Sequence, residues 1–175
     1  MQIIRVVVRK LHHKHCCPND IKGVYKMKLS TRGRYGLRAM IDMAQSEEKG
    51  PIAAHTIAQR QGISERYLEQ LIVPLKRAGL VKSVRGSQGG YILGRNPEQI
   101  TAGDIVRVLE GPIAPVECVS ETNPESCKRE DYCVTRVLWA KVRDSIAAVL
   151  DAYTLADLAK ESQNLPGRST FVYKI

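Results

Sequence analysis

The amino-acid sequence predicts a mainly α-helical fold with one small β-wing, and two observations carry this prediction. Apolar residues recur with i, i+3, i+4, i+7 spacing in several successive segments, which is the spacing of one helix face. One stretch, "LVKSVRGSQGGYIL", instead places short β-prone runs on either side of glycines, which is typical of a hairpin. The elements are taken below in chain order.

The first predicted helix begins at Ser30. Its apolar residues share one face: Leu37, Met40, Ile41 and Ala44. Gly50-Pro51 interrupts the chain, and a short second helix follows over residues 53–61. We expect this helix to end at Gly62, because glycine readily adopts the left-handed conformation that terminates helices.

The third predicted helix covers residues 65–79, with Ser64 as its N-cap and Gly79 at its end. Pro74 lies inside this helix and lacks an N–H, which predicts a kink in the last turn. Its apolar stripe consists of Leu68, Leu71, Ile72 and Leu75. Helix, glycine turn, helix and then a hairpin with the tip "GSQGG" is the order of a winged helix-turn-helix domain.

Beyond the hairpin, Thr101 and Asp104 form a capping-box-like start for a helix over residues 102–111. A proline-containing loop then runs to about Glu130, which is long for a compact domain. A long helix follows at about 131–152. Its apolar stripe consists of Val134, Leu138, Val142, Ile146, Val149 and Leu150.

A final short helix is predicted over residues 155–162, with Thr154 and Asp157 at its start. We expect four parts in the chain. They are a non-native or disordered leader (1–26, with Met27 as an alternative start), a winged helix-turn-helix domain (27–100), a sensor loop with a dimerisation helix (101–162) and a flexible tail (163–175). The leader contains His12, His13, His15, Cys16 and Cys17, and metal binding by this tract is the alternative interpretation.

The formal net charge of +9 is unevenly distributed. Residues 27–100 contain twelve Lys/Arg and six Asp/Glu, whereas residues 101–175 contain nine and eleven. A basic domain favours a polyanionic partner, with nucleic acid first, and an ordinary solvated surface is the alternative.

No apolar run reaches the roughly 18 residues of a membrane span, and no signal-peptide core is present. We therefore expect a cytoplasmic protein without a membrane partner.

The third helix and the hairpin form a candidate DNA-binding surface. The major groove admits one α-helix, and glutamine can bond adenine while glutamate accepts from cytosine. The helix residues that can reach base edges or phosphates are Arg66, Tyr67, Glu69 and Gln70. The hairpin carries Lys82 and Arg85 towards a glycine tip with little bulk, which suits contact with a minor groove or a phosphate.

Four motifs, "MKLSTRGRYGLRAM", "QGISERYLEQL", "GLVKSVRGSQGGYIL" and "CVTRVLW", resemble the bacterial winged-helix family of IscR, NsrR and CymR. The resemblance covers nearly all of residues 27–160. It implies a transcription regulator that forms a homodimer through the long helix and binds a palindromic operator. It also implies that Arg85 enters the minor groove and that the major groove is faced by Ser64, Arg66, Tyr67, Glu69 and Gln70.

Three cysteines, Cys118, Cys127 and Cys133, lie in an otherwise polar stretch. The chain has five cysteines in all, and a reducing compartment disfavours disulfides, so metal binding or redox sensing is the better interpretation. In cluster-binding members of the family, three cysteines of this loop ligate iron. The resemblance therefore implies an iron–sulfur cluster, of the [2Fe–2S] type, on these thiolates. We also expect the neighbouring Lys128 and Arg129 to lower the thiol pKa values.

The sequence leaves the fourth ligand of such a cluster open. Arg136 stands where IscR has a histidine, and Arg34 stands where NsrR has an aspartate. A small thiol, or a carboxylate from among Glu117, Glu130 and Asp131, could serve instead.

This departure supports a second hypothesis. "LEGPIAPVE" and "VRDSIAAVLDAYTLADL" also resemble CymR, which implies a repressor of cysteine-metabolism genes that carries no cluster and partners cysteine synthase. Its thiols would then sense oxidants or nothing. Zinc is less favoured because C-x2-C pairs are missing. An enzyme is not expected, because a cysteine nucleophile needs a nearby base and only His55 lies within 27–175.

Overall fold

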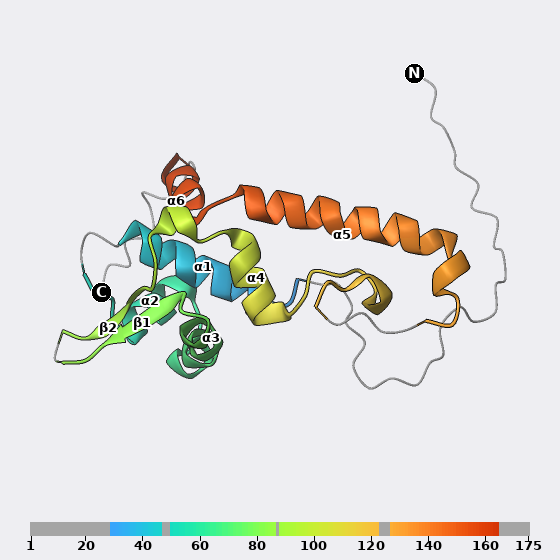
Figure 1. The fold of residues 1–175 in the computed structure, drawn as a ribbon. Helices are drawn as coiled ribbons and strands as arrows, with labels where there is room; N and C mark the ends of the chain where they lie inside the picture. The colour runs from blue at the N-terminus through green and yellow to red at the C-terminus, as the bar shows by residue number, and fades with distance from the viewer. Residues whose placement is uncertain (1–28, 47–49, 87, 123–126, 165–175) are drawn as a thin grey trace, which may run out of the picture.

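The computed structural model describes residues 29–46, 50–86, 88–122 and 127–164. The predictions made for the leader 1–26, including its cysteines and histidines, lie outside the described residues. In the described part of the chain, six α-helices and one two-stranded antiparallel sheet confirm the mainly α fold class (Figure 1). No helix among these residues is long and apolar enough to cross a membrane.

The elements follow the predicted order. The α-helices are α1 (Thr31–Gln45), α2 (Ala54–Gln61), α3 (Glu65–Arg77), α4 (Ala102–Glu110), α5 (Val134–Ala152) and α6 (Leu155–Asn164). The strands are β1 (Val81–Val84) and β2 (Gly90–Leu93). The 3-10 helices among the described residues are η2 (Pro97–Gln99), η3 (Glu117–Val119) and η4 (Glu130–Tyr132).

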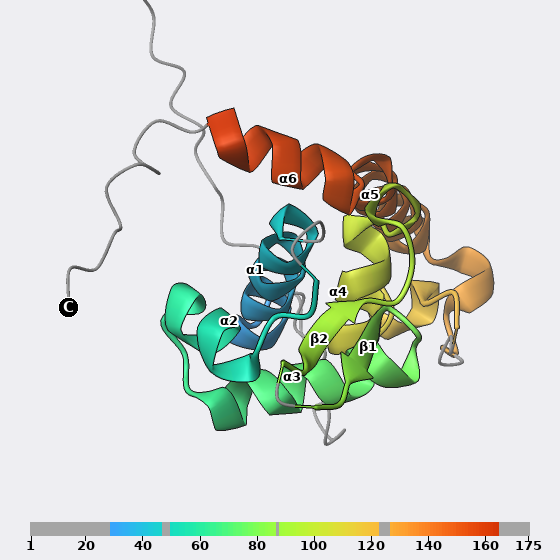
Figure 2. The same cartoon turned by 90° about the vertical axis from the view of Figure 1, so that its left-hand side faces the viewer.

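One hydrophobic core joins the helices α1 to α4, α6 and the hairpin. Met40 and Met43 of α1 and Ile57 of α2 are buried in it together with the apolar stripe of α3. Figure 2 shows α6 lying across α1, with α3 and the sheet on the opposite side of the body. Helical spacing therefore identified the inner face of α3 correctly. In α1, Met40 of the predicted stripe is fully buried, while Leu37, Ile41 and Ala44 are partly buried at the edge of the core.

Helix α1 approaches α4 closely because two glycines of α1 face it. A methyl group at Gly36 would overlap the Leu109 side chain. The backbone N–H of Gly33 donates to Glu110 Oε1 at 2.7 Å, and the Ser30 hydroxyl, which caps α1, bonds the same carboxylate oxygen. The beginning of α1 and the end of α4 are thus held together by one carboxylate.

The predicted helix ends of α2 and α3 are confirmed. Gly62 and Gly79 both have positive φ, at 65° and 72°. In each case the following residue donates back across the last turn: Ile63 N–H to the Ala58 carbonyl, and Leu80 N–H to the Leu75 carbonyl. These bonds satisfy carbonyls that the helix end would otherwise leave without partners. The turn from α2 into α3 and the turn from α3 into the hairpin are therefore both fixed by backbone hydrogen bonds.

The capping predictions are confirmed as well. The Thr101 hydroxyl accepts from the Asp104 N–H, and the Asp104 carboxylate accepts from the Thr101 N–H, which is a complete capping box. Thr154 and Asp157 make the same reciprocal pair at the start of α6. Helix α6 continues to Asn164, two residues beyond the predicted end, and the rest of the predicted tail lies outside the described residues.

The hairpin forms as predicted, with Val81 opposite Leu93 and Val84 opposite Gly90. Its tip differs by one residue from the prediction, because Gly90 belongs to β2 and Arg85 belongs to the connection. A side chain at Gly90 would collide with the Ile52 carbonyl, so the tight packing of Ile52 against β2 requires a glycine inside the strand.

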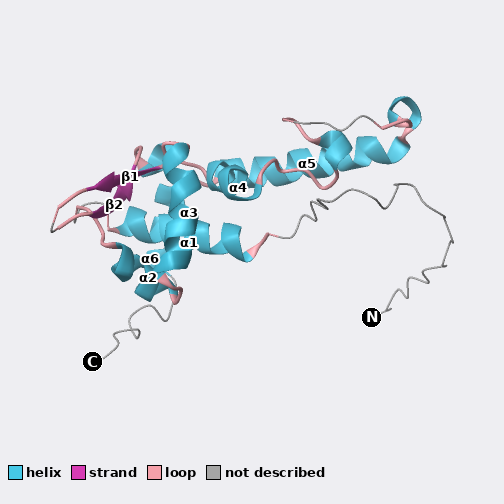
Figure 3. Cartoon of the chain, turned by 90° about the horizontal axis from the view of Figure 1, so that it is seen from below, coloured by secondary structure: helices cyan, strands magenta, loops and turns pink. Residues whose placement is uncertain are grey.

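Helix α5 extends away from the body that the other helices form, on the side opposite the hairpin (Figure 3). It begins at Val134 rather than at about 131, since Glu130–Tyr132 forms a separate 3-10 turn. Helix α3 continues past Pro74 to Arg77. No residue of α5 is buried in the described chain, which sets it apart from the other α-helices.

Candidate DNA-binding surface and cysteine loop

Helix α3 presents one buried and one exposed face. Its four apolar stripe residues are at most 1% exposed, while the predicted contact residues Arg66, Glu69 and Gln70 are exposed. Ser64 is exposed and caps the helix, with the Tyr67 N–H donating to its hydroxyl at 3.2 Å. The structure therefore brings these side chains together on one outward-facing, polar surface.

Tyr67 differs from its neighbours because it is half-buried. Its ring meets the ring of Tyr35 of α1 edge-on, with centroids 6.1 Å apart. The Arg38 guanidinium lies 5.4 Å from the centroid of the Tyr35 ring and donates to the Gln61 side chain at 3.1 Å. This group could not be predicted from the sequence, since nothing in helical spacing pairs an α1 tyrosine with an α3 tyrosine. Tyr67 is consequently oriented by α1.

The wing is joined to α3. Lys82 and Arg85 are both exposed on the hairpin, as predicted. Lys76, near the end of α3, donates to the Ser83 hydroxyl of β1 at 2.8 Å. This contact crosses from the helix to the strand beside Lys82, so α3 and the wing are held in one arrangement.

The three cysteines of the loop occupy different environments. Cys118 lies in η3 and Cys133 immediately precedes α5, and both are partly buried, whereas Cys127 is exposed. All three are free thiols.

Burial raises the pKa of the Cys118 thiol, and the charge of Cys127 raises it further. The pKa of Cys133 is lowered, first by a hydrogen bond with Thr135, whose Oγ1 lies 3.2 Å from Cys133 Sγ, and then by the backbone N–H of Arg136. The expectation that Lys128 and Arg129 lower the thiol pKa values is therefore wrong for Cys118, because burial raises its pKa and the positive charge that opposes this is that of Arg136. For Cys133, Arg129 contributes less than the hydrogen bonds.

Arg136 occupies the position at which the family resemblance places a fourth ligand. Its Nη2 forms an ion pair with Glu130 Oε1 at 2.6 Å, and its Nε donates to the Cys118 carbonyl at 3.4 Å. A guanidinium has no lone pair to offer a metal. Asp131, Cys133 and Arg136 line a hollow of about 400 Å³ at the start of α5.

The donor set fits an iron–sulfur cluster in part. The loop supplies thiols, which are the usual ligands, but the residue at the fourth position is a cation already paired with a carboxylate. Within the described residues, no three His, Cys, Asp or Glu side chains converge closely enough to hold a metal ion.

Helix α5 is joined to α4 at its C-terminal end. Arg107 and Asp151 form a two-pronged ion pair with distances of 2.6 and 2.7 Å. This hydrogen bond lowers the pKa of Asp151 and raises that of Arg107. A side chain on Gly103 would overlap Asp151, so the two helices are in close contact here.

The chain is similar to known proteins in sequence and in fold. The HTH-type transcriptional regulator CymR of Bacillus subtilis (strain 168) is 54% identical over 133 residues, which cover 76% of this chain and 90% of CymR. Its solved structure, described as that of the global cysteine regulator, has a TM-score of 0.63 at 52% identity and covers 77% of this chain and 98% of that one. The structure of IscR from T. potens has a TM-score of 0.65 at 48% identity and covers 81% and 93%. The profile of the Rrf2 family, described as iron-dependent transcriptional regulators, matches residues 29–161, and the chain accordingly belongs to this family of DNA-binding transcriptional regulators.

Proposed function

We propose that this chain acts as a homodimer that binds a palindromic operator in double-stranded DNA through α3 and the wing, and that its three-cysteine loop receives the regulatory signal. The observation that carries the proposal is the exposed polar face of α3, joined to a basic wing by the Lys76–Ser83 bond. Membership of a family of transcriptional regulators also separates this chain from enzymes.

Each side chain of the DNA surface has a role that its chemistry supports. Gln70 can bond the N6 and N7 atoms of adenine, and Glu69 can accept from the N4 amino group of cytosine. Ser64, Arg66 and Tyr67 lie at the start of the same helix and suit phosphate or base contacts in the major groove. Lys82 and Arg85 are exposed and extend this surface along the wing, and on this proposal Arg85 enters the minor groove.

Helix α5 supports the dimer part of the proposal. Its apolar side chains are exposed along the single chain, with Val134 at 84%, Val137 at 60% and Leu138 at 54%. A contiguous apolar surface of this kind typically marks a protein interface. A second copy of α5 offers the same apolar stripe, and an isologous two-fold contact buries both at once.

We infer that the loop thiols Cys118, Cys127 and Cys133 bind an iron–sulfur cluster, of the [2Fe–2S] type. The cluster would supply redox-sensitive chemistry to the regulator. Because Arg136 cannot ligate iron and Glu130 is paired with it, the fourth ligand would be another carboxylate, such as Asp131 beside the same hollow, or a small thiol.

A second candidate is a regulator of the CymR kind, in which the thiols act without a cluster. Two observations favour it: the Arg136–Glu130 ion pair, and the 54% identity with CymR. On this hypothesis the thiol of Cys133, whose pKa is lowered, would react with oxidants, and cysteine synthase would be the protein partner to test.

The absorbance spectrum of protein purified without oxygen distinguishes the two candidates. Bound iron and sulfide with visible absorbance, lost in each of Cys118→Ala, Cys127→Ala and Cys133→Ala, would support the cluster. Colourless protein after anaerobic reconstitution, with all three loop thiols titrating as free, would support the thiol mechanism. Cys16→Ala and Cys17→Ala serve as matched controls outside the loop.

DNA binding is tested by selection from a pool of random duplexes, followed by fluorescence anisotropy on the selected site. We expect a two-fold symmetric consensus and an affinity that falls steeply with salt, because Lys and Arg side chains release counterions from several phosphates. An affinity that is unchanged between low and physiological salt would contradict the proposed surface.

A further inference from the structure

The segment Glu117–Glu121, here called the strap, carries Cys118 and lies against α5. It contains the 3-10 turn η3, which packs on α5. Val119 is only 4% exposed and Ser120 is also buried, although both precede a polar, exposed stretch of loop. A short segment that buries its backbone in this way needs partners for its carbonyl groups.

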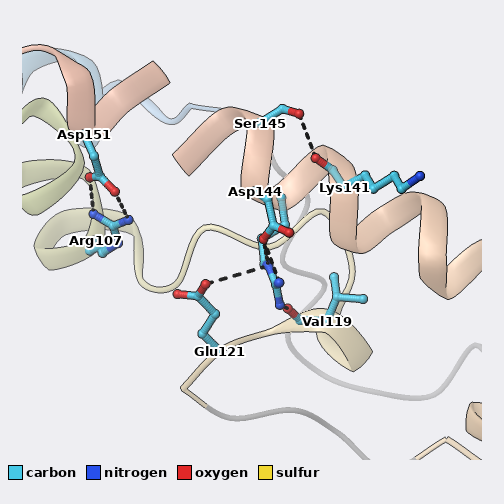
Figure 4. Close-up of polar contacts among 8 residues, drawn as sticks. Arg107, Val119, Glu121, Lys141, Asp144, Ser145 and Asp151 are labelled. Atoms are coloured by element: carbon cyan, nitrogen blue, oxygen red, sulfur yellow. Dashed lines mark hydrogen bonds and ion pairs between the residues drawn. The ribbon is translucent and has the colours of Figure 1, made fainter. Parts of the chain in front are cut away.

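Arg143, near the middle of α5, provides one of these partners. Its Nη1 donates to the Val119 carbonyl at 2.7 Å, and its Nε lies 3.8 Å from Glu121 Oε1. The adjacent Asp144 accepts from the same guanidinium at 2.7 Å and so holds it in place. Figure 4 shows Val119, Glu121 and Asp144 gathered around this point of α5.

Arg136 provides the second partner. Its side-chain Nε donates to the Cys118 carbonyl, and its backbone N–H donates to the Cys133 carbonyl at 3.1 Å. One residue thus contacts the backbones of two of the cysteines. Arg136 and Arg143 are seven residues apart, which places them on the same face of the helix about 10 Å from each other.

Two neighbouring carbonyl groups of the strap, those of Cys118 and Val119, are therefore both bound by guanidinium groups from one helix. A single hydrogen bond would leave the strap free to turn about it. Two bonds on consecutive peptide units fix the orientation of the backbone at Cys118, and with it the direction of the cysteine side chain.

We propose that Arg136 and Arg143 are positioning residues, which hold the strap on α5 so that Cys118 stays beside Cys133 at the start of the helix. This inference rests on the proposed function of the loop as the sensor, and it names the side chains that assemble it. Occupation or modification of the thiols would then reach α5 through these two side chains.

The test uses metal-free, reduced full-length protein in which Cys16, Cys17 and Cys127 are replaced by serine, leaving Cys118 and Cys133. The rate at which bismaleimidoethane joins these two thiols reports how closely they are held together. We expect Arg143→Gln to slow this joining severalfold and Arg143→Lys to retain part of it. The matched control is Lys141→Gln, because Lys141 lies on the same helix and its side chain points away from the strap in Figure 4.

Hydrogen–deuterium exchange of the parent chain gives a second measurement that does not depend on cysteine chemistry. Loss of a charge-assisted hydrogen bond in Arg143→Gln should speed exchange in peptides covering residues 117–122 by roughly tenfold or more. Exchange in α3 should stay unchanged, and Lys141→Gln should leave both regions as they are.

Unchanged joining and unchanged exchange in Arg143→Gln would overturn the proposal. Both measurements are made without DNA and without metal, so they stay informative if the chain binds no cluster. Conversely, a chain that fails to bind DNA can still show a strap held by Arg143. The failure of this inference and the failure of the proposed function are therefore distinguishable.

Discussion

Leu68 of α3 is fully buried, whereas Leu138 of α5 is 54% exposed, although both belong to apolar stripes with the same helical spacing. In the first case the stripe packs against α1, α2 and the hairpin within one chain. In the second, the described chain buries no residue of the helix, and ion pairs at Arg107, Arg136 and Arg143 connect it to the rest. The comparison teaches that one half of the molecule is complete as a single chain, while α5 still lacks the surface against which its stripe would pack.

The largest change in free energy is expected in the half of the molecule whose core is buried within one chain. Leu68→Ala should lower the free energy of unfolding by about 2–5 kcal/mol, because it leaves a cavity in a closely packed core. Urea unfolding followed by circular dichroism measures this change. The matched control is Leu29→Ala, since Leu29 is exposed and should cost little. Similar losses for both substitutions would contradict the assignment of the core.

Gln70→Ala tests the outer face of the same helix. We expect the variant to fold normally and to lose about 1–3 kcal/mol of binding free energy at its selected operator, with relaxed preference at one base pair in each half-site. Fluorescence anisotropy on the selected site and on single-base variants measures both effects. Gln99→Ala is the control, because Gln99 is exposed on η2. Equal losses for the two glutamines would argue against a specific role of α3.

Leu138→Ala tests the incomplete half. If α5 packs against a second copy, removing this side chain should weaken dimerisation by about 1–2 kcal/mol while leaving the unfolding of the N-terminal half unchanged. Sedimentation equilibrium over a range of protein concentrations measures the change. Lys141→Ala on the same helix is the control. A dissociation constant that does not respond to Leu138→Ala would place the dimer contact elsewhere.

The smallest expected effect distinguishes two cysteines within the incomplete half. In metal-free single-cysteine variants, alkylation of Cys133 should reach half its maximal rate at a lower pH than an ordinary thiol, because the hydrogen bond with Thr135 lowers its pKa. Cys118 should need a higher pH, because burial raises its pKa. Rates with iodoacetamide across pH measure both profiles.

Thr135→Val provides the control for these profiles. It should move the Cys133 profile to higher pH and leave that of Cys118 in place, because Thr135 is the largest cause of the Cys133 shift. Identical profiles for the two thiols would contradict the environments described here.

The elements that depend on local sequence could be predicted from the sequence. Helical spacing identified the buried face of α3, and Gly62 and Gly79 marked helix ends because only local backbone geometry is involved. Contacts made to backbone carbonyls across the fold could not be predicted in the same way. The carbonyl of Val119 has no signature in the sequence, so its bond with Arg143 was missed, although Arg136 was recognised as a departure from the family pattern.

In the candidate site too, features set by local sequence could be predicted, whereas features set by contacts across the fold could not. The exposed positions of Arg66, Glu69, Gln70, Lys82 and Arg85 agree with their predicted roles, but their contacts with DNA stay predictions. The pKa of Cys118 was predicted with the wrong sign. The sequence shows Lys128 and Arg129 nearby, whereas the dominant cause is burial, which depends on how the strap folds.

The ion pair between Arg107 and Asp151 fixes the C-terminal end of α5 beside the body of the chain, so a tilt of the helix pivots about this end. The helix has 19 residues and is about 28 Å long, so a tilt of about 5° at the joint moves its far end by roughly 2.5 Å. The same geometry applies to a movement that starts at the cysteine end, where a large displacement produces only a small rotation at the joint. A displacement of a few ångströms at the thiols turns the helix through only a few degrees at the body, which favours a signal that moves the loop far over one that shifts a single atom.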